Sequence, residues 1–192
     1  MRQVFLAVLL RELRAYFLSP LAYVFIAVYV LVSGLATWNL ARFFDTAIAS
    51  LSPFFQFQPW LLAIFIPAIG MRLWSEDLRS RTADLYFTSQ RPLWVIHLAK
   101  FVSGLCVLLA ALFATLPYWI SVNYLGAPDN SVIVSSYVSL LLIGGLFLLI
   151  TLAFSALTHQ QVIAFVLSSI SAFALLSLGL PNVIGQISGL VP

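Results

Sequence analysis

The chain has 192 residues, of which 62% are hydrophobic and 8% are charged, and its formal net charge is +3. A soluble domain contains roughly 25% charged residues, so a globular protein in water is excluded. The mean hydropathy of +1.07 indicates a polytopic membrane protein whose solvent is lipid. Nine basic residues spread along such a chain are typical of topology signals and not of a nucleic-acid surface. The single cysteine, Cys106, lies in an apolar run and excludes an internal disulfide or a CxxC site.

Residues 1–19 predict an interfacial helix at the N-terminus. The apolar run Val4–Leu10 is short, is followed by the charged sequence RELR, and has no small-residue cleavage site after it, so it is not a signal peptide. In a helix, Arg11 and Arg14 fall near one face and apolar side chains near another, which places the arginines toward lipid headgroups.

Five apolar segments that follow are candidates for membrane spans. The first holds no charge, and its twenty residues at about 1.5 Å each would cover the roughly 30 Å hydrocarbon core. Pro67 is expected to kink the second. The five segments are 21–40, 59–74, 100–122, 132–157 and 161–178.

The third span is placed after Lys100. A lysine at mid-membrane costs about 2.5–3.5 kcal/mol, so residues 93–100 are expected to form a helical lead-in at the interface. The tail 179–192 is rich in glycine and proline, and it is interpreted as a re-entrant or interfacial segment.

The distribution of basic residues predicts the orientation. With the N-terminus in the cytoplasm, eight of the nine basic residues lie inside and only Arg42 lies outside. Arg72 and Lys100 then mark the cytoplasmic boundaries of the second and third spans. The chain is therefore expected to be an all-α, multi-pass protein of the cytoplasmic membrane, with a single transmembrane domain over residues 1–192.

Six of the 15 charged residues fall within positions 72–84. Residues 75–88 predict a short cytoplasmic helix with Ser75 as its N-cap. Spacings of three or four residues would pair its charges with one another. Such a helix suits docking on a soluble partner, whereas a solvated loop that only maintains topology is the alternative. The candidate partner-binding residues are Glu76, Asp77, Arg79, Arg81 and Asp84.

The sequence carries no motif for catalysis or for binding a cofactor. There is no GxxxxGK[ST] sequence for ATP, and no HExxH, GxSxG or metal-binding cluster. His97 and His159 are far apart and are interpreted as interface histidines. Because the predicted spans hold no ionisable side chain, an ion-coupled transporter or channel is disfavoured. We expect a non-catalytic subunit without a cofactor of its own.

The segment 71–101 resembles the first cytoplasmic loop of ABC-2 type transporter permeases, and most closely that of the gliding-motility-associated permease group. The N-terminal helix likewise resembles the elbow helix of that family. The chain departs from the family in carrying Arg81 for a glycine, Asp84 for a glutamate, and Gln90-Arg91 before the proline. The matching positions are Met71-Arg72, Glu76-Asp77, Arg79, Thr82, Asp84-Leu85, Pro92 and Lys100-Phe101.

The resemblance implies that residues 75–88 are a coupling helix, which sits in a groove of a separate ATP-binding subunit. Mg-ATP would bind to that partner, and two permease subunits, identical or different, would form the exporter in the bacterial inner membrane. The family has six spans, whereas five are recognised here. A membrane anchor of a motility or envelope machine, through which no solute passes, is the alternative, and the sequence does not identify a substrate.

Overall fold

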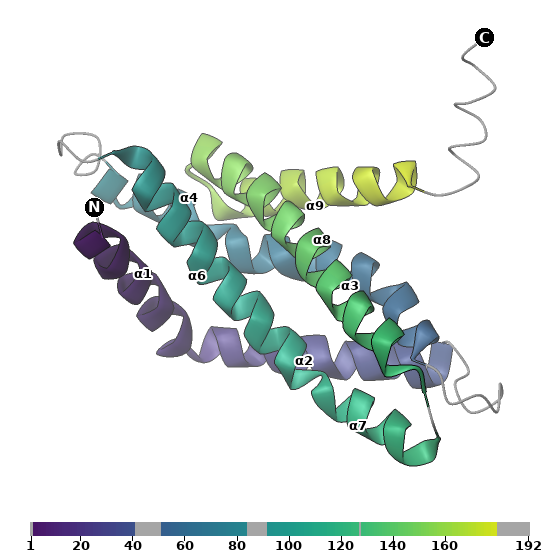
Figure 1. Ribbon diagram of the computed structural model, residues 1–192. Helices are drawn as coiled ribbons and strands as arrows, with labels where there is room; N and C mark the ends of the chain where they lie inside the picture. The colour runs from purple at the N-terminus through teal and green to yellow at the C-terminus, as the bar shows by residue number, and fades with distance from the viewer. Residues whose placement is uncertain (1, 41–50, 84–91, 127, 180–192) are drawn as a thin grey trace, which may run out of the picture.

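A computed structural model of the chain describes residues 2–40, 51–83, 92–126 and 128–179. Every regular element within these residues is a helix, which confirms the all-α prediction. Figure 1 shows the helices packed side by side as a bundle. In chain order the elements are α1 (Arg2–Phe17), α2 (Pro20–Leu35), the π-helical turn η1 (Ala36–Leu40), α3 (Ser52–Gly70), α4 (Arg72–Arg79), α6 (Leu93–Ala114), α7 (Leu116–Leu125), α8 (Asn130–Leu157) and α9 (Gln161–Leu178).

Several of these helices have the length and composition of membrane spans. Four segments are long and apolar enough to cross a membrane by themselves: Ser52–Arg79, Leu93–Leu125, Asn130–Leu157 and Gln161–Leu178. The helices α1 and α2 are long and apolar enough only when they are taken together as one bent pair. A polytopic helical membrane protein is thus confirmed at this level, while the count of five spans and the interfacial elbow helix stay predictions.

The helices that contain the second and third predicted spans begin before the spans themselves. Helix α3 begins at Ser52, with Pro53 in its first turn, and α4 continues it beyond the interruption at Met71. Helix α6 begins at Leu93, so residues 93–100 are helical, as the sequence predicts, and they continue directly into the third predicted span. Thr115 separates α6 from α7, whose second residue, Pro117, has no backbone N–H to continue the ladder.

Helices α6 and α8 pack through two matched contacts between glycine and leucine. A Cβ atom added at Gly104 would lie 2.7 Å from Leu148 Cδ2, and one added at Gly144 would lie 2.6 Å from Leu108 Cδ2. Each leucine therefore occupies the space that a side chain on the other helix would need. Small residues of this kind allow close approach of helices in lipid, where no hydrophobic force drives them together.

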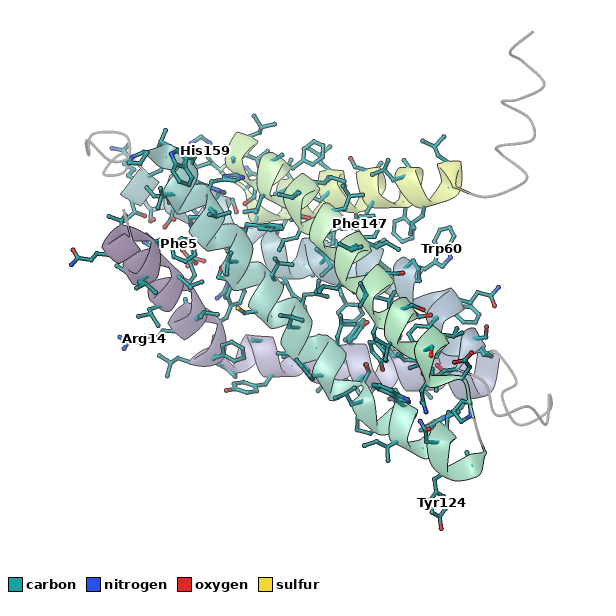
Figure 2. All side chains as sticks on the ribbon, in the orientation of Figure 1. Phe5, Arg14, Trp60, Tyr124, Phe147 and His159 are labelled. Carbon is teal, nitrogen blue, oxygen red and sulfur yellow. The ribbon has the colours of Figure 1, made fainter. Side chains whose placement is uncertain are left out.

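The two ends of the bundle differ in chemistry. We use the term charged end for the end where α4 packs against α8 and α9 and where Arg11, Glu12, Asp77 and Lys100 form ion pairs. Figure 2 shows His159, in the turn between α8 and α9, at the same end. The opposite end is formed by α7 and the first turns of α3 and α8. Among the described residues of that opposite end, Asp129 is the single charged side chain. It caps α8 by accepting a hydrogen bond from the backbone N–H of Ser131.

Candidate functional site

The site that stands out is a buried lysine at the charged end. The side chain of Lys100 is 0% exposed, although it belongs to a chain with few charges. Its Nζ atom donates to Glu12 Oε1 at 3.0 Å, to Asp77 Oδ2 at 2.5 Å, and to the carbonyl oxygen of Leu73. All three ammonium hydrogens therefore have an acceptor. The ring of Trp74 lies below the same nitrogen, with its centroid 5.0 Å away.

The partners of Lys100 come from two other helices. Glu12 lies on α1, which packs along α6, and Asp77 lies on α4. Arg11 on α1 completes the group, because its Nη2 atom lies 3.0 Å from Asp77 Oδ2 and 2.5 Å from Glu12 Oε1. Two positive and two negative charges thus balance within one cluster. We refer to Arg11, Glu12, Asp77 and Lys100 as the charge cluster.

The charge cluster explains how a lysine can lie in the interior of the bundle. Removing a charge from water costs several kcal/mol per ion, and only close partners of opposite sign with satisfied hydrogen bonds offset that cost. Asp77 meets this condition: besides Lys100 and Arg11, its Oδ1 atom accepts a hydrogen bond from Thr82 Oγ1 at 3.2 Å. The three helices are therefore coupled, since moving one away leaves a buried charge without its partner.

Helix α8 holds the start of α4 by a different contact. The Oγ atom of Ser155 accepts hydrogen bonds from the backbone N–H groups of Trp74 and Ser75, both at 3.0 Å, and donates to the carbonyl oxygen of Met71 at 2.8 Å. The first N–H groups of a helix have no partner within that helix. A side chain of α8 thus serves as the cap that α4 lacks in its own sequence.

Ser75 was expected to be an N-cap, and this expectation is wrong. It is fully buried in the middle of α4, where its hydroxyl donates to the carbonyl oxygen of Met71. Helix α4 begins at Arg72, three residues before the predicted start, and ends at Arg79, where a turn at 80–81 interrupts the predicted helix before residues 82–83 are helical again. Residues 73–75 resemble a helix boundary in the sequence, whereas in the structure they belong to the buried interior of the bundle.

The predicted pairing within this helix also differs from what is observed. Asp77 contacts Lys100 and Arg11 on other helices, and its expected partner Arg81 is exposed. Arg81 has a backbone φ of 58°, in the left-handed region, and it ends the regular helix together with Ser80. Glu76 and Arg79 are exposed on the surface of α4. Asp84 and the rest of the predicted segment up to residue 88 lie outside the described residues.

The boundary residues have specific contacts of their own. Arg72 donates from Nη2 to the carbonyl oxygen of Ala15 at 2.9 Å, and its guanidinium carbon lies 4.3 Å from the ring centroid of Tyr16. The hydroxyl of Tyr16 donates to the carbonyl oxygen of Ile69 at 2.7 Å. These contacts attach the end of α1 to the α3–α4 junction. Arg14 is exposed and points away from the bundle in Figure 2.

His97 lies in the same region of the bundle, where its ring contacts Trp74. The Nε1 atom of Trp74 donates to His97 Nδ1 at 3.1 Å, and the two rings stack with centroids 5.8 Å apart. In the described part of the chain, no group of three or more His, Cys, Asp or Glu residues is placed to hold a metal ion.

The structure unites residues that the sequence analysis treated separately. Arg11 was assigned to lipid headgroups, Asp77 to a soluble partner and Lys100 to the membrane boundary, yet the three side chains meet in one cluster. The side chain of Lys100 is enclosed by protein, and its place at the membrane boundary stays a prediction. Glu12 was missed. The one feature of the sequence that could have indicated Glu12 is its position as an acidic residue between arginines, in RELR, on a helix that is otherwise mainly apolar.

Comparison of the chain with protein-family models, with curated proteins and with solved structures produced no match. Assignment to the ABC-2 permease family therefore rests on the residues of segment 71–101 and stays a prediction.

Proposed function

We propose that this chain is the membrane permease subunit of an ABC-2 type exporter in the bacterial inner membrane, with its N-terminus in the cytoplasm. A separate ATP-binding subunit would bind and hydrolyse Mg-ATP, and a second permease subunit would complete the transporter. In this proposal the chain itself is not an enzyme. Its task is to convert the movement of the partner into movement of the membrane helices.

The observation that supports this proposal most is the position of Asp77. It lies in the last turns of α4, the segment that the family resemblance assigns to coupling, and it contacts Lys100 on α6 and Arg11 on α1. A force applied to α4 would reach both helices through these ion pairs. Ser155 adds a connection from α4 to α8.

The side chains of α4 and of the turn after it suggest two separate roles. Glu76, Arg79 and Arg81 are exposed and are available to a partner, whereas Asp77 is buried within the chain's own cluster. We therefore assign partner binding to the exposed residues and transmission of movement to Asp77. The sequence predicts partner binding for all of them, and the burial of Asp77 limits that role to the exposed residues.

The proposal is tested by purifying the chain from its own host in a mild detergent and identifying the retained proteins by mass spectrometry. A retained ATPase with a Walker motif is the expected result, and its ATP hydrolysis should change when the permease is present. Recovery of the folded chain without an ATPase, at several detergent concentrations, would contradict the proposal.

Two variants then separate binding from transmission. The triple variant Glu76→Ala, Arg79→Ala, Arg81→Ala should lose the ATPase, whereas Asp77→Asn should retain it but lose ATP-dependent transport. Arg14→Ala is the matched control, because Arg14 is an exposed arginine of the same end. Insertion and topology are checked for each variant, since removal of arginines weakens the positive-inside signal. Normal coupling in Asp77→Asn would contradict the role given to the charge cluster.

A further inference from the structure

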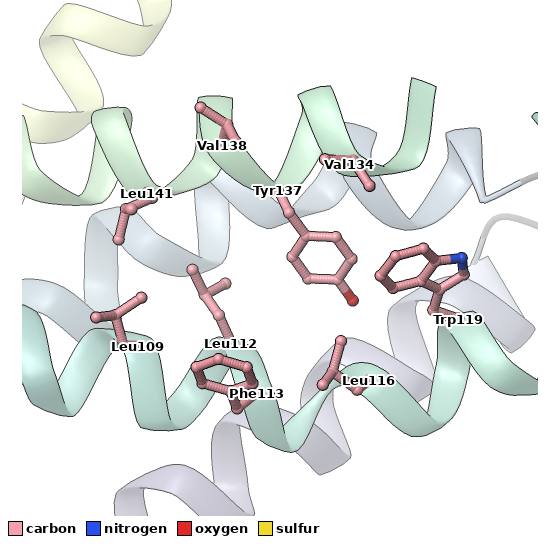
Figure 3. A pocket seen from close by; sticks show the side chains of 9 residues that line it. All are labelled: Leu109, Leu112, Phe113, Leu116, Trp119, Val134, Tyr137, Val138 and Leu141. Carbon is pink, nitrogen blue, oxygen red and sulfur yellow. The ribbon is translucent and has the colours of Figure 1, made fainter. Parts of the chain in front are cut away.

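The opposite end of the bundle holds an apolar groove between α6–α7 and α8 (Figure 3). Its volume is about 240 Å³. The groove lies beside the α6–α7 break, and Leu116 from the start of α7 forms part of its wall. The lining consists of aliphatic and aromatic side chains: Leu109, Leu112, Phe113, Leu116, Trp119, Val134, Tyr137, Val138 and Leu141.

The groove offers no unused polar atom to a ligand. The hydroxyl of Tyr137 is 3.1 Å from Thr115 Oγ1, and the indole N–H of Trp119 donates to Asn130 Oδ1 at 2.8 Å. Every other lining side chain is a hydrocarbon. A polar ligand would lose its hydration in this groove without gaining a hydrogen bond. The lining therefore selects an apolar occupant.

The position of the groove indicates where that occupant comes from. Both walls belong to segments that are long and apolar enough to cross a membrane, Leu93–Leu125 and Asn130–Leu157. Several lining side chains, including Phe113 and Val138, are exposed, so the groove opens at the surface of the bundle. An empty apolar hollow would forfeit dispersion contacts, and the molecules that fill such a surface in a bilayer are acyl chains.

The end of the groove adds a preference for one class of headgroup. Asn130, which binds Trp119, follows Asp129, and Asp129 is the single charged side chain among the described residues of this end. A carboxylate favours a cationic ammonium group nearby and disfavours an anionic headgroup. We propose that the groove binds one acyl chain of a phospholipid whose ethanolamine headgroup lies beside Asp129.

Native mass spectrometry of the purified chain tests this proposal. The protein is mildly delipidated and then offered phosphatidylethanolamine or phosphatidylglycerol with identical acyl chains. We expect one phosphatidylethanolamine to be retained per chain and phosphatidylglycerol to be retained about threefold less, the scale of an exposed ion pair. Equal retention of both lipids would overturn the headgroup assignment.

A larger side chain within the groove tests the site of binding. Val138 is 52% exposed, so Val138→Trp can fill the groove without displacing the core. Retention should fall about tenfold, as expected when the burial of roughly two methylene groups is lost. Leu142→Trp is the control, because Leu142 lies one turn away on α8, is 70% exposed and does not line the groove. Equal retention in both variants would overturn the proposed site.

Two further outcomes are decisive. Asp129→Asn keeps a side chain that caps helices well but removes the charge, so it should abolish the preference for phosphatidylethanolamine over phosphatidylglycerol, and a preference that persists would overturn the role of Asp129. If Val138→Trp instead converts a dimer into a monomer while lipid retention stays constant, a second copy of the chain covers the groove and the lipid proposal is wrong.

Discussion

The charged end and the centre of the bundle are held together by opposite means. At the charged end, side chains from α1, α4 and α6 meet through ion pairs around the buried Lys100. In the centre, α6 and α8 approach closely where Gly104 faces Leu148 and Gly144 faces Leu108, and these contacts are made by apolar groups. Neither kind of contact depends on the exclusion of water, because no hydrophobic driving force acts between helices in lipid.

The difference lies in what happens when each contact is disturbed. An ion pair in an apolar interior is directional, and its loss leaves a charge with neither water nor a partner. A packed contact loses dispersion energy in proportion to the atoms separated. The charged end should therefore respond to disturbance as one unit, whereas the centre should respond gradually. Four substitutions test this contrast.

The largest effect is expected for Lys100→Met. Removal of the cation leaves Glu12 and Asp77 buried together, and breaking a buried ion pair typically costs about 3–5 kcal/mol. Unfolding in mixed detergent micelles, followed by circular dichroism, measures the loss. The combined variant Glu12→Leu, Asp77→Leu, Lys100→Met should recover most of it, because no charge is then left unpaired in the cluster's interior. A triple variant as unstable as Lys100→Met would show that packing, and not charge, explains the effect.

A smaller effect is expected from a methyl group added at the centre. Gly144→Ala would place a Cβ atom against the buried Leu108, and overpacking of a core costs about 1–3 kcal/mol. Gly145→Ala is the matched control: it has the same gain in helix propensity, but its Cβ atom would lie an ordinary 3.7 Å from Leu105 Cδ2. The difference in unfolding free energy between the two variants isolates the packing contribution, and equal stability would contradict the close approach.

The contact between α8 and α4 should rank next. Ser155→Ala removes the acceptor for two backbone N–H groups, and we expect a loss of about 1 kcal/mol, since hydrogen bonds between membrane helices contribute about 0.6 kcal/mol on average. Ser168→Ala is the control, because Ser168 is equally buried and its hydroxyl donates to Ala164 on its own helix. Thermal unfolding should show a larger shift for Ser155→Ala, and the reverse order would exclude the capping role.

The smallest effect is expected at the turn after α4 and has the opposite sign. Arg81 has a φ of 58°, which costs a side chain roughly 1 kcal/mol and costs glycine nothing. Arg81→Gly should therefore stabilise the chain slightly, whereas Glu76→Gly, at an exposed position in the middle of α4, should destabilise it by about 1 kcal/mol. Paired unfolding curves measure both, and destabilisation by both changes would mean that the side chain of Arg81 makes a necessary contact. The left-handed position is the same one at which the resembling family carries glycine.

The class of fold could be predicted from composition, because a chain so poor in charge has few alternatives. The boundaries of α4 could not. Residues 72–79 look like the start of a solvated segment, but the buried side chains of Leu73, Trp74 and Ser75 keep this helix within the bundle. Local charge patterns report which side chains prefer water, and they do not report which neighbours another helix brings.

Lys100 shows more clearly that a local sequence pattern does not reveal the contacts made by other helices. The cost of a lone lysine in lipid predicts a place at the membrane boundary, and the structure adds partners from α1 and α4 that offset this cost. Those partners lie 88 and 23 residues away in sequence. Pairing at that separation depends on how the helices pack, which spacing within one helix does not reveal.

The matched glycine and leucine contacts between α6 and α8 also define an allowed register. Gly104 faces Leu148 while Leu108 faces Gly144, so the two helices run antiparallel and each leucine packs against the glycine of the other helix. A slide by one helical turn in one direction would bring Leu108 opposite Leu148, and a slide in the other direction would bring Gly104 opposite Gly144 and leave a void. Piston motion between these helices is therefore blocked in both directions. Any movement that passes through this pair must rotate or tilt them as a unit.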